Sequence, residues 1–283
     1  MHILETLIIT TALAGVAGTG LGGLIGAMLQ KNSNRVVSLL LSFAGGVMLS
    51  VVCFDLVVEA VETNVGVAFV AGAIALGVIV TYLLNHWIDQ KTNPEVPHIN
   101  ANHPKTADDL KELIHSDHWE QHYAKHDSKL SLFVAGIVMA CAIALHNVPE
   151  GMTIGASYAS NNGVMGSAAL VLAVLIGLHN IPEGMAVSVP LISGGMPKWK
   201  AVLLTASTGI PTILGALLGY AIGEIGPMGL TISLGFASGA MLYVVFGEIL
   251  PQSILMYHSK QPAFSTIIGI LVGMLIVFKS SCR

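Results

Sequence analysis

Two copies of one hexapeptide carry the side chains of this sequence that are best suited to chemistry. His146 to Gly151 is HNVPEG and His179 to Gly184 is HNIPEG, each within a long apolar run. On an α-helix, the His at position i and the Glu at i+4 share a face, and the Asn at i+1 lies beside them. Each copy therefore presents an imidazole, an amide and a carboxylate together, which is a donor set for a metal ion.

The proline of each hexapeptide, Pro149 or Pro182, removes one helical hydrogen bond. The carbonyl four residues earlier, at Leu145 or Leu178, then lacks its usual donor. We therefore predict a broken helix at each motif, as is found at substrate sites inside membranes.

The two motifs together offer six donors to one cation: His146, Asn147, Glu150, His179, Asn180 and Glu183. A carboxylate at the bilayer centre costs about 2.5–3.5 kcal/mol, and a divalent cation would neutralise two of them. Mixed nitrogen and oxygen donors suit Zn²⁺, Fe²⁺, Mn²⁺, Co²⁺ or Cd²⁺ and disfavour Cu⁺ and Mg²⁺. The alternative is a buried His–Glu pair that only locks two helices together, which the duplication disfavours.

The composition decides that these motifs lie in a membrane. Hydrophobic residues make up 54% of the 283 residues and charged residues only 10%, against roughly a quarter charged in soluble domains. Eight apolar runs each approach the ~20 residues that span a bilayer. They lie near residues 3–29, 36–58, 66–88, 130–158, 164–192, 201–222, 228–250 and 263–278. We expect an all-α integral membrane protein with eight transmembrane helices, the first run included.

Positive charge predicts the orientation, because short cytoplasmic loops collect Lys and Arg. All but two of these residues lie in the loops after spans 1, 3, 5 and 7, and only Lys279 and Arg283 fall on the other side. We predict an integral protein of the plasma (bacterial inner) membrane with both termini outside.

An internal repeat predicts the architecture. Residues 44–55 (AGGVMLSVVCFD) match residues 237–248 (ASGAMLYVVFGE), and residues 19–26 resemble residues 212–219 at the same offset of 193. Five spans separate the copies, so spans 1–3 and 6–8 have opposite orientations. We predict a 3+2+3 bundle with an inverted repeat around a central helix pair, spans 4 and 5. Such repeats are typical of transporters, with the site near the midplane.

The predicted organisation is a single membrane domain in four segments. Spans 1–3 occupy 1–88, a cytoplasmic histidine-bearing loop 89–129, spans 4 and 5 with the metal site 130–192, and spans 6–8 the remaining 193–283.

The paired HNxPEG motifs resemble those of the ZIP family of divalent-metal transporters, particularly its bacterial broad-specificity zinc permeases. The resemblance covers most of the chain, including the eight spans and the loop after span 3. It implies that the six donors form the transport site, and that Zn²⁺ and related ions are carried into the cytoplasm by alternating access, without a cofactor or enzymatic activity. It also implies that spans 1, 4, 5 and 6 move as a block.

Four further positions are weaker candidates, and a fifth, Thr212, departs from the family. Some relatives have a Glu in span 6 that helps to hold a second metal, and Thr212 stands at that position here, so we predict a single ion. Met48 matches a ligand position of the family, although Met on an apolar helix usually fills the core. Asp55 and Glu59 would gather cations near the outer face, and Glu248, near the cytoplasmic end of span 7, would line the exit.

The loop after span 3 is rich in histidine. His115, His118, His122 and His126 follow at steps of three, four and four residues, on one face of a helix. Such tracts bind metal, so we expect the loop to collect or sense zinc; an indifferent polar linker is the alternative.

Two other classes of protein stay open at this point. A membrane-embedded zinc-dependent hydrolase would use similar ligands, but the sequence has no HExxH motif. A non-transporting metal receptor is the second class. As partners we expect divalent metal ions and the lipid bilayer but no nucleic acid, and a homodimer is left open. Cys53, Cys141 and Cys282 form no CxxC pair, so we expect free thiols.

Overall fold

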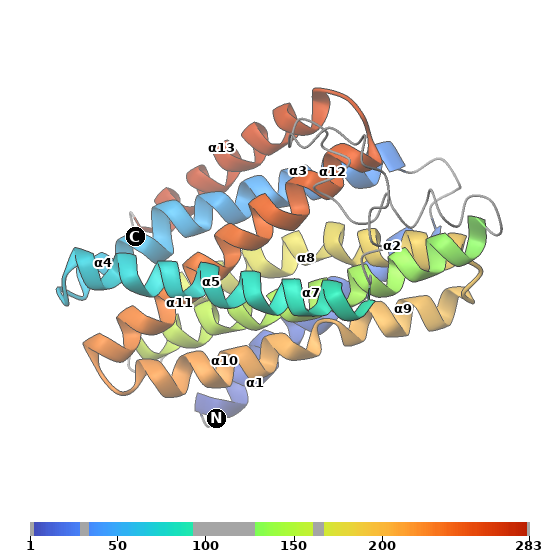
Figure 1. Ribbon diagram of the computed structural model, residues 1–283. Helices are drawn as coiled ribbons and strands as arrows, with labels where there is room; N and C mark the ends of the chain where they lie inside the picture. The colour runs from blue at the N-terminus through green and yellow to red at the C-terminus, as the bar shows by residue number, and fades with distance from the viewer. Residues whose placement is uncertain (1–2, 29–33, 93–127, 161–166, 282–283) are drawn as a thin grey trace.

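The structure, a computed structural model, describes residues 3–28, 34–92, 128–160 and 167–281. These residues form helices joined by short turns, without strands in that part of the chain. Eight of the helical segments are long and apolar enough to cross a membrane, which confirms the predicted count. They lie side by side in one bundle, and the start of the first and the end of the last lie at the same end of it (Figure 1).

Four spans are single helices and four are interrupted. The single ones are α5 (Val67–Thr92), α7 (Ser128–Ser160), α8 (Ser167–Ser193) and α13 (Gln261–Ser281). Span 1 consists of α1 (Ile3–Ala12), the π-helical turn η1 (Leu13–Ala17) and α2 (Gly18–Met28); span 2 of α3 (Asn34–Val51), η2 (Val52–Leu56) and α4 (Val57–Glu62). Span 6 consists of α9 (Lys198–Ser207) and α10 (Ile210–Gly223), and span 7 of α11 (Pro227–Val244), η3 (Val245–Ile249) and α12 (Leu250–Met256).

The prediction of a broken helix at each motif is wrong. Both α7 and α8 continue as α-helices through Pro149 and Pro182. A proline removes a single ladder bond, and in a membrane neighbouring groups can satisfy the freed carbonyl. The interruptions occur instead in spans 1, 2, 6 and 7, which pack around these two helices.

The packing follows the repeat. Helix α2 packs on α8 as α10 packs on α7, and α3 packs on α13 as α11 packs on α5. Exchanging spans 1–3 with spans 6–8, and α7 with α8, turns each of these contacts into its counterpart. The π-helical turns also match, since η2 and η3 lie 193 residues apart at both ends. The expected inverted arrangement is therefore visible in the contacts as well as in the sequence.

Glycine permits the closest of these contacts. A Cβ at Gly22 of α2 would collide with the carbonyl oxygen of Ile181, and a Cβ at Gly215 of α10 with that of Val148. Both positions thus require a residue without a side chain, because backbone lies directly against backbone. The result is that α7 and α8 are each held by one half of the repeat.

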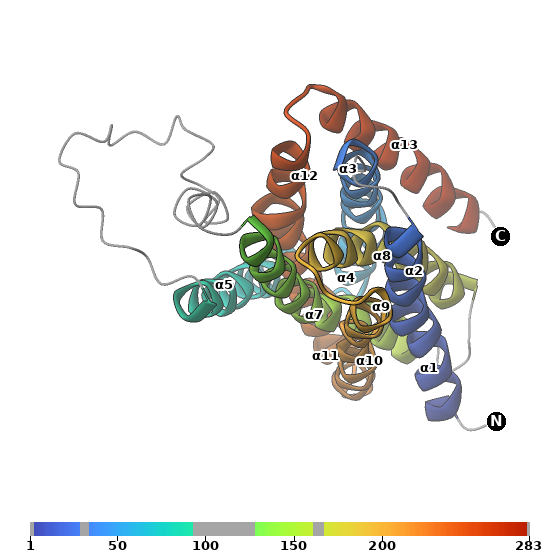
Figure 2. The ribbon, with the colours of Figure 1, turned by 90° about the vertical axis from the view of Figure 1, so that its right-hand side faces the viewer.

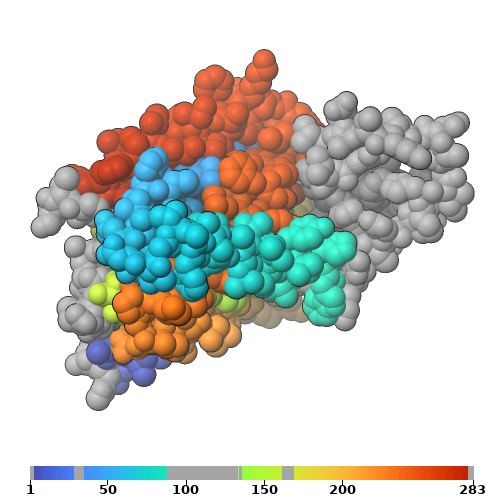
Figure 3. Space-filling model, turned by 60° about the vertical axis from the view of Figure 1, so that its left-hand side comes forward, coloured from blue at the N-terminus to red at the C-terminus, as the bar shows by residue number. Residues whose placement is uncertain are grey.

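The two motif helices lie towards the middle of the bundle and α5 and α13 at its edge. Figure 2 shows α8 between α7, α3 and α2, with α5 and α13 outside. In Figure 3 α5 runs across the face of the molecule that is turned to the viewer, and most of its exposed side chains are apolar, including Leu76, Ile79 and Leu83. Such a surface faces lipid. Water therefore does not reach the polar residues of the interior through this surface to compete for their hydrogen bonds.

Candidate metal site

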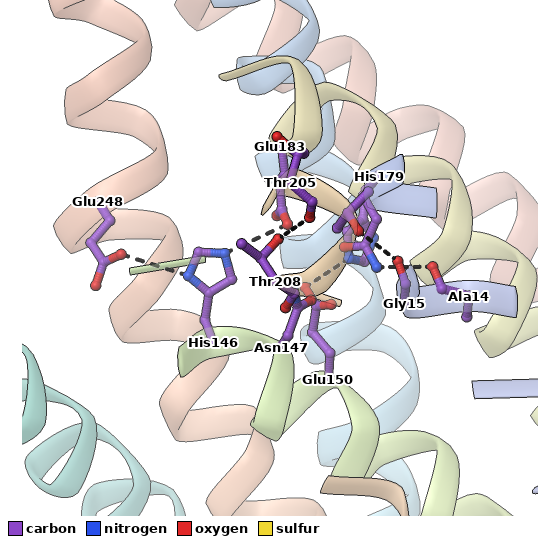
Figure 4. A network of polar contacts seen from close by, with 12 residues as sticks. Ala14, Gly15, His146, Asn147, Glu150, His179, Glu183, Thr205, Thr208 and Glu248 are labelled. Atoms are coloured by element: carbon purple, nitrogen blue, oxygen red, sulfur yellow. Dashed lines mark hydrogen bonds and ion pairs between the residues drawn. The ribbon is translucent and has the colours of Figure 1, made fainter. Parts of the chain in front are cut away.

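The two hexapeptides meet in the interior. His146 lies near the middle of α7 (Ser128–Ser160) and His179 near the middle of α8 (Ser167–Ser193). Because α7 and α8 pack on each other, the two motifs face one another (Figure 4). The histidines are 3% exposed, and the asparagines and glutamates of both motifs are fully buried.

Each histidine pairs with the glutamate of the other helix. His179 Nε2 lies 2.9 Å from Glu150 Oε1, and His146 Nε2 lies 3.5 Å from Glu183 Oε2. The two pairs cross between the helices rather than running along either one (Figure 4). Glu150, His179 and Glu183 each place one potential ligand atom within 4.8 Å of the other two. A single ion can therefore reach donors from both helices.

Several buried acceptors of this cluster lack a hydrogen bond. They are Oδ1 of Asn147 and of Asn180, Oε2 of Glu150 and both carboxylate oxygens of Glu183. Leaving one such group unpaired costs about 1–3 kcal/mol, and more where it is charged. Buried amide and carboxylate oxygens that lack donors are groups that a cation can stabilise.

The amide nitrogens of the same asparagines are occupied. Asn147 Nδ2 donates to the carbonyl oxygen of Thr208 at 2.7 Å, and Asn180 Nδ2 donates to that of Ala14 at 3.1 Å. These bonds fix each amide so that its oxygen stays available as a ligand. Neither contact could be predicted from residue types, because the acceptors are backbone atoms of distant spans.

The charge of the site agrees with a divalent cation. No Lys or Arg lies within Gly136–Ser160 of α7 or within Ala169–Ser193 of α8, so these stretches supply no permanent positive charge to Glu150 and Glu183. Two carboxylates with neutral imidazoles and amides carry a formal charge that one M²⁺ balances. Mixed nitrogen and oxygen donors suit Zn²⁺ and the neighbouring transition metals.

The predicted location of Glu248 is wrong, since it does not lie at the end of span 7. The span continues through η3 and α12 to Met256, and Glu248 Oε2 lies 3.6 Å from His146 Nδ1. Its side chain is 18% exposed, so it joins the buried cluster to a more open region. The repeat could have indicated this importance, because it matches Glu248 to Asp55, another acidic residue in a π-helical turn.

The other weak candidates lie outside the cluster of pairs. Met48 is fully buried in the largest hydrophobic core, together with Met241. Asp55 and Glu59 are partly buried in η2 and α4. Although the repeat matches Asp55 to Glu248, no ion pair among the described residues joins Asp55 to His179 in the way that Glu248 joins His146. Their roles in ion supply, and that of Met48 as a ligand, stay predictions.

Thr212 lies at the position where some relatives have a Glu. It is fully buried in α10, and its hydroxyl has no hydrogen-bond partner. A hydroxyl carries no charge with which to bridge a second cation, so the prediction of a single ion stands as an expectation.

The loop histidines His115, His118, His122 and His126 lie outside the described residues, as does Cys282. Cys53 and Cys141 are free and exposed. Both lie on membrane-spanning helices, as the sequence indicated.

The eight spans and the buried donors define an integral membrane protein with a cluster suited to a divalent cation. The family model described as "ZIP Zinc transporter" matches residues 4–280. The chain therefore belongs to the ZIP family, a family of transporters rather than of hydrolases.

Named relatives match over nearly the same length. The chain is 30% identical over 277 residues to zinc transporter ZupT of Clostridium perfringens, covering 94% of this chain and 92% of the relative. It is 31% identical over 286 residues to ZupT of Chlorobium luteolum, covering 98% and 97%. It is 33% identical over 264 residues to zinc transporter ZIPB of Bordetella bronchiseptica, covering 92% and 75%.

Proposed function

We propose that this protein carries Zn²⁺, and with it related divalent transition metals, across the plasma membrane into the cytoplasm. The transport site consists of the six donors of the two hexapeptides, His146, Asn147, Glu150, His179, Asn180 and Glu183, and it holds one ion. The names of the relatives support zinc as the cargo.

The observation that carries the proposal is the set of buried oxygens without donors. Asn147 and Glu150 come from α7, Asn180 and Glu183 come from α8, and each has a buried oxygen without a hydrogen-bond donor. If the cluster were only a lock between helices, we would expect these atoms to be paired with protein donors, as buried polar atoms generally are.

Alternating access is supported by the repeat. The two halves pack on α7 and α8 through equivalent helices, so an opening on one side of the site has a counterpart on the other. The position of His146 and of His179 near the middle of α7 and α8 supports a site near the midplane. A receptor without transport would have no need for such two-sided packing.

Zinc flux into sealed vesicles tests the proposal. Purified protein is reconstituted into vesicles that contain a membrane-impermeant zinc dye, and zinc is added outside. We expect the dye signal to rise with time and to saturate with zinc concentration, whereas protein-free vesicles stay dark. Zinc that binds the protein while the dye stays silent would identify a receptor and contradict transport.

Orientation has its own test in cells. On a background in which Cys53, Cys141 and Cys282 are replaced by Ser, a Glu224→Cys variant should react with a membrane-impermeant maleimide in intact cells. A Lys260→Cys variant should react only after permeabilisation, because the positive loops face the cytoplasm. The reverse labelling pattern would show that both termini are inside.

A further inference from the structure

The interruptions of spans 1 and 6 lie against each other. A Cβ at Gly15, within η1, would collide with Thr212 Oγ1 and would lie 2.6 Å from the carbonyl oxygen of Gly209. A Cβ at Gly209 would lie 2.6 Å from Val16 N. Gly209 belongs to the two-residue turn between α9 and α10. The two spans therefore cross, backbone on backbone, at the places where neither is α-helical.

Both interruptions are held by the metal motifs. Asn180 of α8 donates to Ala14 at the start of η1, and Asn147 of α7 donates to Thr208 at the start of the turn. All four residues are buried. A non-α-helical turn leaves carbonyls without their ordinary donors, and these asparagines supply one to each.

We propose that Asn147 and Asn180 are positioning residues that couple ion occupancy to the crossing of spans 1 and 6. This inference rests on the proposed metal site. A cation on Oδ1 draws electron density from the amide and makes its N–H a stronger donor. The bonds to Ala14 and Thr208 are then tightest in the loaded protein and weaken when the ion leaves. Loading therefore stiffens the crossing, and release loosens it.

Hydrogen–deuterium exchange measures this coupling without reference to flux. In the parent protein, added zinc should slow exchange in peptides covering residues 8–24 and 203–216, where the crossing lies. Peptides from α5 should change little, because α5 does not contact either interruption. Zinc that binds the parent without protecting either crossing peptide overturns the inference.

The variants Asn147→Asp and Asn180→Asp separate the role of the side-chain oxygen as a metal ligand from the role of the N–H group as a donor to the crossing. Each keeps an oxygen for the ion but replaces the N–H donor with a second oxygen facing a carbonyl. We expect zinc to bind within about tenfold of the parent affinity, while the zinc-dependent protection disappears and the maximal flux falls about 10–100-fold, as for outer-shell partners. The zinc concentration at half-maximal flux should not rise in proportion, as it would if only a ligand were lost.

A glycine variant tests the same coupling with every donor in place. Gly209→Ala pushes the crossing apart, and it should retain zinc binding but lose protection and flux. Gly177→Ala is the control, since its Cβ would lie in ordinary contact, 3.5 Å from Ala14 Cα. Zinc-binding Asn→Asp or Gly209→Ala variants with the parent's protection and maximal flux overturn the inference. If zinc slows hydrogen exchange in the crossing peptides of the parent protein but the parent shows no zinc flux, transport is refuted and the coupling of ion occupancy to the crossing is retained.

Discussion

Replacing either buried glutamate by glutamine is expected to lower zinc flux by at least about 100-fold, because losing even an outer-shell partner of a metal ligand costs about 10–100-fold and these residues are proposed ligands. Glu150→Gln and Glu183→Gln keep the shape of the side chain and remove one negative charge from a site whose two helices carry no Lys or Arg within Gly136–Ser160 and Ala169–Ser193. The ion then meets one carboxylate in a medium that screens charge poorly. Initial flux into dye-loaded vesicles measures the loss, and zinc binding should weaken in parallel.

The matched control is Glu224→Gln, which removes the same charge from an exposed residue after α10. It should transport at the parent rate. Parent-like flux in Glu150→Gln and Glu183→Gln, with the zinc recovered inside the vesicles, would show that the assigned site does not carry the ion. Loss of flux in the control would point to an effect of charge on the whole protein.

The second large effect concerns the glycines that let the repeat grip the motif helices. In Gly22→Ala the new Cβ would lie 2.9 Å from Gly184 Cα, and in Gly215→Ala 2.9 Å from Val148 C, besides the carbonyl oxygens already in the way. Backbone cannot rotate aside as a side chain can, so the helices must separate. We expect a loss of about 1–3 kcal/mol and an unfolding temperature lower by about 2–10 °C, together with reduced flux.

Gly72→Ala provides the comparison for this pair. Gly72 is also helical, but a Cβ there meets nothing within 4 Å. Its unfolding temperature should equal or slightly exceed that of the parent, because alanine is the better helix former. If Gly22→Ala and Gly215→Ala unfold at the same temperature as Gly72→Ala, the close contacts of α2 and α10 are not needed for stability.

Much of this fold could be predicted from the chain itself. Apolar runs near 20 residues fix the spans, and the doubled HNxPEG string indicates the cluster because His and Glu four residues apart must share a helical face. The offset of 193 predicts the repeat. Each of these signals is local or is a comparison of the chain with itself.

The contacts that tune the site could not be predicted in this way. Whether Pro149 breaks α7 depends on what the neighbouring helices supply, and the acceptor of Asn180 is a backbone oxygen at Ala14, about which residue types say nothing. Glu248 lies close to His146 because of how α7 and span 7 pack. The apolar run ends before the helix does, so the sequence predicts Glu248 nearer to the end of span 7 than it lies.

The matching of η2 and η3 bears on the history of the protein. A π-helical turn accommodates one extra residue in an α-helix, and the same extra residue at equivalent places in spans 2 and 7 points to an insertion that preceded duplication. The ancestral polypeptide then already had an acidic residue in that turn, ancestral to Asp55 and Glu248.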